Sequence, residues 1–179
     1  MAGDLLVGLK GKAIAKLVRY SWWPASEVAA RLDIEDRMAF SLTAGPLAIH
    51  FDDGTVLGVA SDPSLNSVVI WDDAARSEGR NSGALADDAD LYAIPDNSEF
   101  ATASWRQFAG LHVTGITILK RDGMDAKQCS RPGEVGLRFS FRGGRRFIAS
   151  HGLHDNSDDF SVIEESQLPD VALMELPIS

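Results

Sequence analysis

The sequence contains few of the features that mark secreted or membrane-bound proteins. It has one cysteine, Cys129, in 179 residues, so no disulfide can form within the chain. No stretch approaches the roughly 18 consecutive apolar residues of a membrane-spanning helix. The first residues lack the basic start and long apolar run of a signal peptide. We therefore expect a soluble cytoplasmic protein with no membrane partner.

Basic residues are also scarce, with 17 Lys and Arg against 26 Asp and Glu and a net charge of −9. Residues 72–99 contain eight acidic residues and two arginines, and residues 147–179 contain seven acidic residues and no Lys or Arg. Such a charge distribution repels nucleic acid and attracts basic partners. The alternative is that both regions are solvated loops that keep the protein soluble.

Residues 46–59 and residues 136–149 share one pattern. Each has an alternating apolar run, a turn that ends in glycine and a second apolar run, which is typical of a β-hairpin. The two stretches align without a gap. The aligned pairs are Leu47 with Leu137, Ile49 with Phe139, Phe51 with Phe141, Gly54 with Gly144, and Leu57 with Phe147.

The segments around the hairpins predict further strands and short helices. Each hairpin is preceded and followed by a stretch that favours a strand. Pro169 and Pro177 exclude a central strand from the apolar tail, which we expect to be extended. The predicted strands are residues 11–20, 67–71, 113–120 and 160–163, and the predicted helices are residues 26–40 and 100–108.

The fold class that follows is α+β and β-rich. It has two similar halves of antiparallel strands, about eight strands in all, with one or two short helices. We predict a single domain, residues 1–179, in which halves 1–75 and 100–179 are joined by an acidic connector, residues 76–99. A structureless loop of that length is unusual in a compact domain, so the connector contains a short element or has a function.

Two histidines are the first candidates for metal chemistry. His151 and His154 lie near Asp155, Asp158 and Asp159, and these side chains are suitable metal ligands. The segment is not clearly helical, however, so nothing fixes both rings on one face. We favour a solvated loop and predict no metal.

The sequence offers little for catalysis or DNA binding. Cys129 lies near two basic residues that favour a thiolate, but no base is placed beside it. No nucleophile-elbow or phosphate-binding pattern is present. Residues 25–36 resemble the start of a helix-turn-helix, yet the residues that would form its recognition helix, 34–39, carry two acids and one arginine, where DNA contact requires cations. We expect no catalytic residues, no cofactor and no nucleic-acid partner.

Four arginines gather in the second hairpin: Arg138, Arg142, Arg145 and Arg146. They could bind an anion or an acidic surface. The favoured alternative is a solvated sheet face whose charge the acidic connector neutralises.

Residues 105–110, followed by a strand, and residues 135–148 resemble parts of small bacterial immunity proteins, which are encoded beside polymorphic or contact-dependent toxins. Residues 45–54 are similar in character. The resemblance implies a non-enzymatic cytoplasmic protein that occludes a toxin domain. It transfers no functional residue to this chain.

Our first hypothesis is therefore a protein that uses its acidic connector to bind a basic partner, a cognate toxin, with an apolar anchor beside the acids. The expected partner-binding residues are Trp71, Asp72, Asp73, Asp87, Asp88, Asp90 and Tyr92.

Two alternatives remain open from the sequence. One is a small-ligand-binding or enzymatic β-rich domain with a pocket between the halves. The other is a homodimer, instead of a monomer, that uses an exposed strand edge and one of Trp22 and Trp23, since adjacent residues of a strand face opposite ways. The first alternative would draw on His50, His112, His151 or His154.

Overall fold

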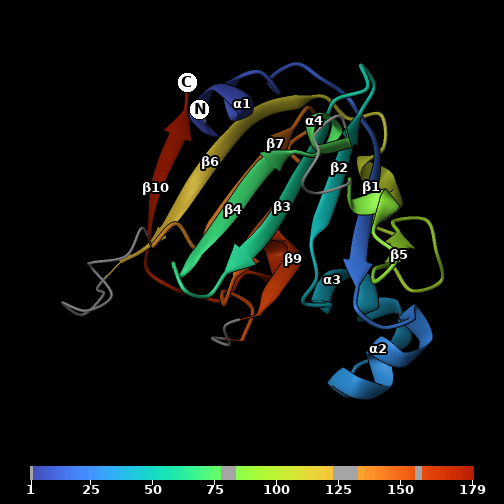
Figure 1. Ribbon diagram of the computed structural model, residues 1–179. Coiled ribbons are helices and arrows are strands. Elements are labelled where there is room, and N and C mark those ends of the chain that lie inside the picture. Colours follow the sequence, from blue (N-terminus) through green and yellow to red (C-terminus); the bar gives the residue numbers. More distant parts are fainter. Residues whose placement is uncertain (1, 78–83, 123–132, 156–158) are drawn as a thin grey trace.

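The computed structural model describes residues 2–77, 84–122, 133–155 and 159–179, and within these ranges ten strands form two five-stranded antiparallel sheets (Figure 1). Sheet 1 consists of β1 (Ile14–Ser21), β2 (Leu47–Phe51), β3 (Val56–Asp62), β4 (Ser67–Asp72) and β5 (Tyr92–Pro95). Sheet 2 consists of β6 (Val113–Arg121), β7 (Gly136–Phe141), β8 (Arg146–His151), β9 (Phe160–Glu164) and β10 (Leu173–Ile178).

Short helices connect and flank the strands. The α-helices are α1 (Ala2–Val7), α2 (Ala25–Leu32), α3 (Ala39–Leu42) and α4 (Asp73–Ser77). The 3-10 helices are η1 (Asp36–Met38), η2 (Leu85–Asp87), η3 (Trp105–Phe108) and η5 (Glu165–Gln167).

The two sheets have the same topology. Sheet 1 has the order β4-β3-β2-β1-β5, and sheet 2, counted from its β9 edge, has the order β9-β8-β7-β6-β10. Each sheet is thus a four-stranded meander whose fifth strand pairs with its first. The predicted β-rich α+β fold with two similar halves is confirmed, and the strands number ten.

The two predicted hairpins, β2–β3 and β7–β8, share one register. Ile49 pairs with Leu57, and Phe139 pairs with Phe147, so the positions aligned in sequence are also equivalent in space. The turns match as well. Gly54 has φ 88° and Gly144 has φ 83°, a region that glycine enters without the steric cost of a Cβ atom.

The sheets meet where β1 and β6 begin. An isolated antiparallel bridge joins Ala13 to His112, and the hydrogen bonds on its two sides form matched pairs. The arrangement has an approximate twofold axis at this bridge. One matched pair consists of the bonds from Gly11 N–H to the Val113 carbonyl (2.8 Å) and from Gly110 N–H to the Ile14 carbonyl (2.7 Å).

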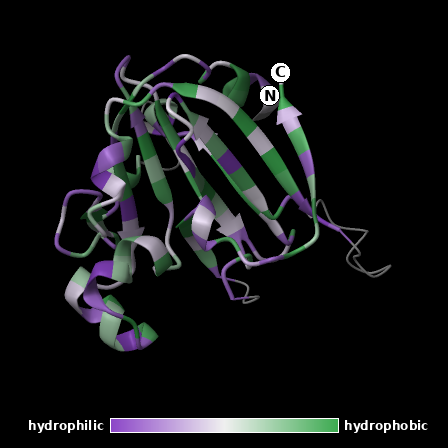
Figure 2. Cartoon of the chain, turned by 180° about the vertical axis from the view of Figure 1, so that it is seen from behind, coloured by the Kyte–Doolittle hydropathy of each residue, from purple (hydrophilic) through white to green (hydrophobic). Residues whose placement is uncertain are grey.

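One hydrophobic core takes side chains from both sheets. Leu17 and Ile49 of sheet 1 and Phe139 and Phe147 of sheet 2 belong to it and are fully buried, together with Phe40 of α3. Figure 2 shows the hydrophobic residues along the strands of both sheets, whereas α2, which projects from the body, carries many hydrophilic residues. The two halves therefore stabilise each other through a shared apolar interior.

Each sheet also has an outer face with its own small apolar cluster. On sheet 1, Leu85 and the partly buried Leu91 of the connector pack over Val18, Tyr20 and Ala48. On sheet 2, residues of the C-terminal segment cover the strands. These are Leu168, Val171 and Leu173, packed against Leu119, Ile148 and Ile163.

The expected helix at residues 26–40 is interrupted. α2 ends at Leu32, and Asp33 adopts a left-handed conformation with φ 54°. Asp33 and the acidic residues after it favour turns over helix interiors, so the chain continues as η1 and then α3. The second expected helix, residues 100–108, is reduced to η3. Within the described ranges no helix is both long and apolar enough to cross a membrane.

The strands that the sequence did not predict, β5 and β10, are the fifth strand of each sheet. β5 follows Leu91 in the connector. β10 lies in the apolar tail, for which the sequence predicted an extended segment and no central strand because of its prolines. Pro177 pairs with Thr117 of β6 at the edge of sheet 2, where a missing N–H can face away from the ladder.

Candidate functional site

The described part of the connector, residues 76–77 and 84–99, forms short elements on sheet 1 and its outer face. It contains the end of α4, η2 and β5, and β5 pairs with β1. Leu85 of η2 is buried, and Leu91 is partly buried in the same cluster. The apolar residues of this acidic segment therefore anchor it on the sheet, which leaves its polar side chains facing solvent.

Asp73 fixes η2 of the connector to the strand that precedes the connector. Its side chain is 4% exposed. It accepts hydrogen bonds from Trp71 Nε1 at 2.8 Å and from the Leu85 backbone N–H at 3.1 Å. Asp73 therefore joins the end of β4 to η2, and its burial removes it from any surface that a partner can touch.

Trp71 lies flat against sheet 1. A Cβ atom at Gly58, its cross-strand neighbour on β3, would come within 2.1 Å of Trp71 Cε2, so only glycine leaves room for this indole. The guanidinium of Arg76 lies over the indole, 4.3 Å from a ring centroid. Trp71 therefore contacts both Gly58 of the sheet and Arg76 of the connector.

Gly58→Ala is expected to displace Trp71 and lower the free energy of unfolding by about 1–3 kcal/mol, the usual cost of overpacking. The displaced indole would also lose its bond to Asp73. Urea denaturation followed by tryptophan fluorescence measures both effects. Gly115→Ala is the matched control, because nothing lies within 4 Å of a Cβ atom at that strand position. Equal stability of the two variants would contradict this account of Trp71.

Three carboxylates of the connector lie on its solvent side. Asp87, Asp88 and Asp90 are all exposed. The Asp90 N–H donates to Asp88 Oδ1 at 2.9 Å, which shapes the turn after η2. Burial raises the pKa of the Tyr20 hydroxyl, and the nearby charges of Asp73 and Asp87 raise it further. The outer face of sheet 1 therefore has a negative local field.

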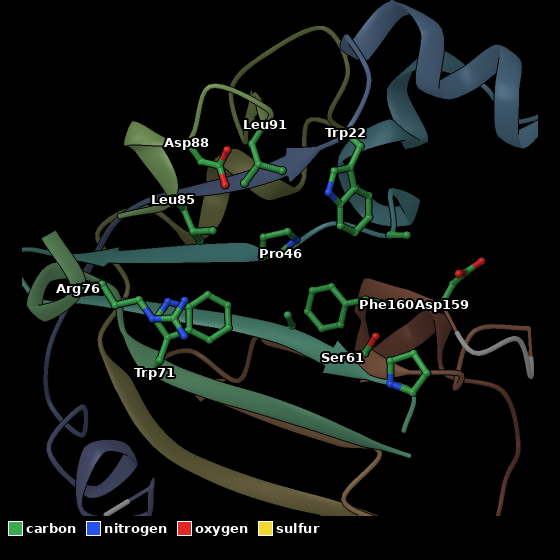
Figure 3. Close-up of a pocket in the computed structure, with 13 residues that line it drawn as sticks. Trp22, Pro46, Ser61, Trp71, Arg76, Leu85, Asp88, Leu91, Asp159 and Phe160 are labelled. Atoms are coloured by element: carbon green, nitrogen blue, oxygen red, sulfur yellow. The ribbon is translucent and has the colours of Figure 1, made fainter. Parts of the chain in front are cut away.

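Beside these carboxylates is a groove of about 510 Å³ (Figure 3). Trp22 and Leu91 lie along one side, and Trp71 and Phe160 lie along the other, with Pro46 between them. The charged residues at its wall are Arg76, Asp88 and Asp159. The groove is therefore mainly apolar and aromatic, with a polar rim, as binding sites for proteins and small molecules commonly are.

Four of the seven predicted partner-binding residues, Trp71, Asp87, Asp88 and Asp90, lie on or beside this face, whereas the strand register directs Asp72 and Tyr92 to the core-facing side of β4 and β5. Trp71 and Asp88 line the groove, and Tyr92 is 47% exposed on β5. Asp72 is exposed at the end of β4 and accepts the Ala75 N–H at 3.1 Å, so it also holds the first turn of α4. Asp73 alone of the seven is buried.

The sequence reasoning did not associate Trp22 or Phe160 with the connector. Trp22 follows β1, and Phe160 begins β9 of the other sheet. Trp22 and Trp23 were expected to face opposite ways along a strand. Both lie just beyond β1 and are exposed, by 51% and 37%. Two adjacent tryptophans after a predicted strand were the signal available in the sequence.

The four histidines lie on separate elements. His50 is on β2, His112 precedes β6, and His151 ends β8. Burial lowers the pKa of His50, and the charge of Lys16 lowers it further. Across the residues that the structure describes, no three His, Cys, Asp or Glu side chains gather closely enough to hold a metal ion. Cys129 and Asp158 lie outside the described residues.

The expectation of a solvated loop at residues 151–154 was wrong. His151 is 2% exposed and pairs with Phe160 of β9, and Leu153 is 1% exposed. Leu153 belongs to the apolar cluster on sheet 2, and its packing there keeps the segment out of solvent.

Two of the four arginines of the second hairpin, Arg138 and Arg146, pair with acidic residues of the C-terminal region and not with the connector. Arg138 is only 9% exposed. It binds Glu175 of β10 through two hydrogen bonds of 2.7 and 2.8 Å, and Glu165 of η5 lies 2.9 Å from its Nε. The hydrogen bonds from Arg138 lower the pKa of Glu175. Arg146 also pairs with Glu165, at 3.0 Å.

The chain matches no protein-family model, no curated protein and no solved structure.

Proposed function

We propose that this chain is a non-enzymatic binding protein that attaches to a basic protein through the face formed by the connector and the groove. The observation that carries the proposal is the arrangement of Asp87, Asp88 and Asp90 on solvent-exposed backbone beside a groove lined by aromatic residues. Exposed acids accelerate association with a basic surface, and a central apolar anchor supplies most of the binding energy.

The resemblance of the hairpins to bacterial immunity proteins makes the proposal more specific. The partner is then a cognate toxin domain, and the chain neutralises it in the cytoplasm by covering its functional surface. This role requires no catalytic group on this chain. It requires a rigid surface, and the connector provides one because Leu85, Leu91 and Asp73 fix it to sheet 1.

The proposal is tested by neutralising the exposed acids. The variant Asp87→Asn/Asp88→Asn/Asp90→Asn keeps a side-chain oxygen at each position and removes three charges. We expect it to weaken binding of a basic partner by about 10- to 100-fold at low salt. The matched control, Glu35→Gln/Asp36→Asn/Asp170→Asn, removes three exposed charges elsewhere and should bind as the wild type does.

The measurement begins with parallel capture from lysate of the native host by the wild type and both variants. The partner is defined as a basic protein retained in stoichiometric amount by the wild type and the control. Its Kd is then measured with purified proteins at low and moderate salt. A Kd that is equal for wild type and the connector variant would contradict the proposal, and so would a Kd that salt does not raise.

A second candidate function is the binding of a small apolar ligand. A cavity of about 420 Å³ is lined by residues of both halves, including Leu6 of α1, Val68 of β4 and Leu137 of β7. None of the four histidines is among the described residues that line it. A saturated fatty acid such as dodecanoate should raise the melting temperature if this cavity is a ligand site. An unchanged melting temperature would remove this candidate.

A further inference from the structure

Trp22 differs from the other three tryptophans in what covers its indole. The guanidinium of Arg31 lies 4.9 Å from a ring of Trp23, and that of Arg76 lies 4.3 Å from a ring of Trp71. Trp105 is buried among phenylalanines. Trp22 is 51% exposed, and within the described part of the chain no ring or cation covers its indole. The groove thus contains one open aromatic face.

The surroundings of that face are acidic. Asp88 and Asp159 line the same groove, and Asp87 and Asp90 stand beside it on the connector. Among the described residues that line the groove, the one cation is Arg76, and its guanidinium is already stacked on Trp71. A positively charged group that enters beside Trp22 would therefore meet a negative field and an indole face together, and both attract cations.

The two sheets differ in the cation that their equivalent strands offer to the acidic residues of the outer face. By the matched hairpin register, Ala48 of sheet 1 is equivalent to Arg138 of sheet 2. Arg138 binds Glu165 and Glu175 on the outer face of sheet 2. The outer face of sheet 1 has acidic residues on its connector but an alanine at the equivalent position. Ala48 is 1% exposed and packs against Leu85, so this strand position supplies no cation to the connector carboxylates, and a cation that pairs with them must reach them through the groove.

We infer that the groove is a subsite for an arginine side chain of a basic partner, with its guanidinium stacked on Trp22 and paired with Asp88. This inference rests on the proposed function, since it names the group that the acidic face recognises. A planar guanidinium can stack on an indole and donate to a carboxylate at the same time. A lysine ammonium lacks the planar surface and binds such a site less well.

The test uses fluorescently labelled nona-arginine and nona-lysine peptides, with fluorescence anisotropy at low salt. The wild type is expected to bind the arginine peptide about threefold or more tightly than the lysine peptide. Trp22→Leu should abolish this preference. Trp23→Leu, a change of the adjacent exposed tryptophan, should preserve it. Thermal unfolding of both variants checks that each is folded.

Charge variants separate this inference from the proposed function. Asp88→Asn should weaken binding of the arginine peptide more than Asp170→Asn, which removes an exposed carboxylate elsewhere. The inference is overturned if the preference for arginine survives in Trp22→Leu, or if the wild type shows no preference. In either case, weaker binding of both peptides to the connector triple variant than to the wild type would support the acidic binding face and contradict only the arginine subsite. If neither peptide binds the wild type, the arginine subsite is overturned, and the Kd measurement on the captured partner still decides the proposed function.

Discussion

Replacing Arg19 by methionine is expected to lower the free energy of unfolding by about 3 kcal/mol. Arg19 is on β1 and is fully buried. Its Nε donates to the Phe40 carbonyl at 2.9 Å, and its Nη2 donates to the Thr43 carbonyl and to the Phe160 carbonyl. Its guanidinium also lies 4.6 Å from the centroid of the Phe160 ring. One side chain thus joins β1, α3 and β9.

The cost arises because methionine leaves three buried carbonyl groups without this donor. Removing a desolvated charge offsets part of that cost. Burial lowers the pKa of Arg19 to about 9, which still leaves the guanidinium charged at neutral pH. Arg19→Lys keeps the charge but loses the planar fork, and it should cost about 2 kcal/mol. Urea denaturation of the three proteins measures both values. A methionine variant as stable as the wild type would show that Arg19 does not join these elements.

Phe147→Ala is expected to cost about 3–5 kcal/mol, because it removes the central ring of the aromatic cluster between the sheets. The ring of Phe147 stacks on Phe139 at 4.9 Å and meets Phe108 edge-on at 5.2 Å. It also contacts the rings of Trp105 and Phe141. Small domains are stable by only about 5–15 kcal/mol, so this variant should be close to unfolding.

The matched controls for Phe147→Ala are a conservative core change and a surface change. Phe147→Leu keeps most of the apolar volume and should cost about 1–2 kcal/mol. Leu65→Ala removes a side chain that is 41% exposed and should cost less than about 1 kcal/mol. Thermal and urea unfolding of the set should rank the losses in that order. A loss for Phe147→Ala as small as that for Leu65→Ala would contradict the shared core.

The fold could be predicted where local pattern and burial agree. Leu47, Ile49 and Phe51 alternate with less apolar residues and end at a glycine turn, so their strand and its register followed from the sequence. β5 and β10 could not be predicted in the same way. Each is short or contains proline, and each forms because an edge of its sheet offers backbone partners.

The candidate site was predicted in part. Runs of Asp in the connector identified the acidic face without any knowledge of the fold. The position of Trp22 beside Leu91 and Phe160 depends on contacts between distant segments, which no local pattern specifies. Asp73 was grouped with its exposed neighbours because a sequence does not show that its carboxylate accepts from Trp71 and Leu85.

The most direct test of the central claim is a growth assay in bacteria. The captured basic partner is expressed alone, with the wild-type chain, with the connector variant Asp87→Asn/Asp88→Asn/Asp90→Asn, or with the control variant. We expect the partner alone to inhibit growth, the wild type and the control variant to restore it, and the connector variant to restore it poorly. A partner that does not inhibit growth, or full protection by the connector variant, would contradict the claim that this chain neutralises a toxin through its acidic connector.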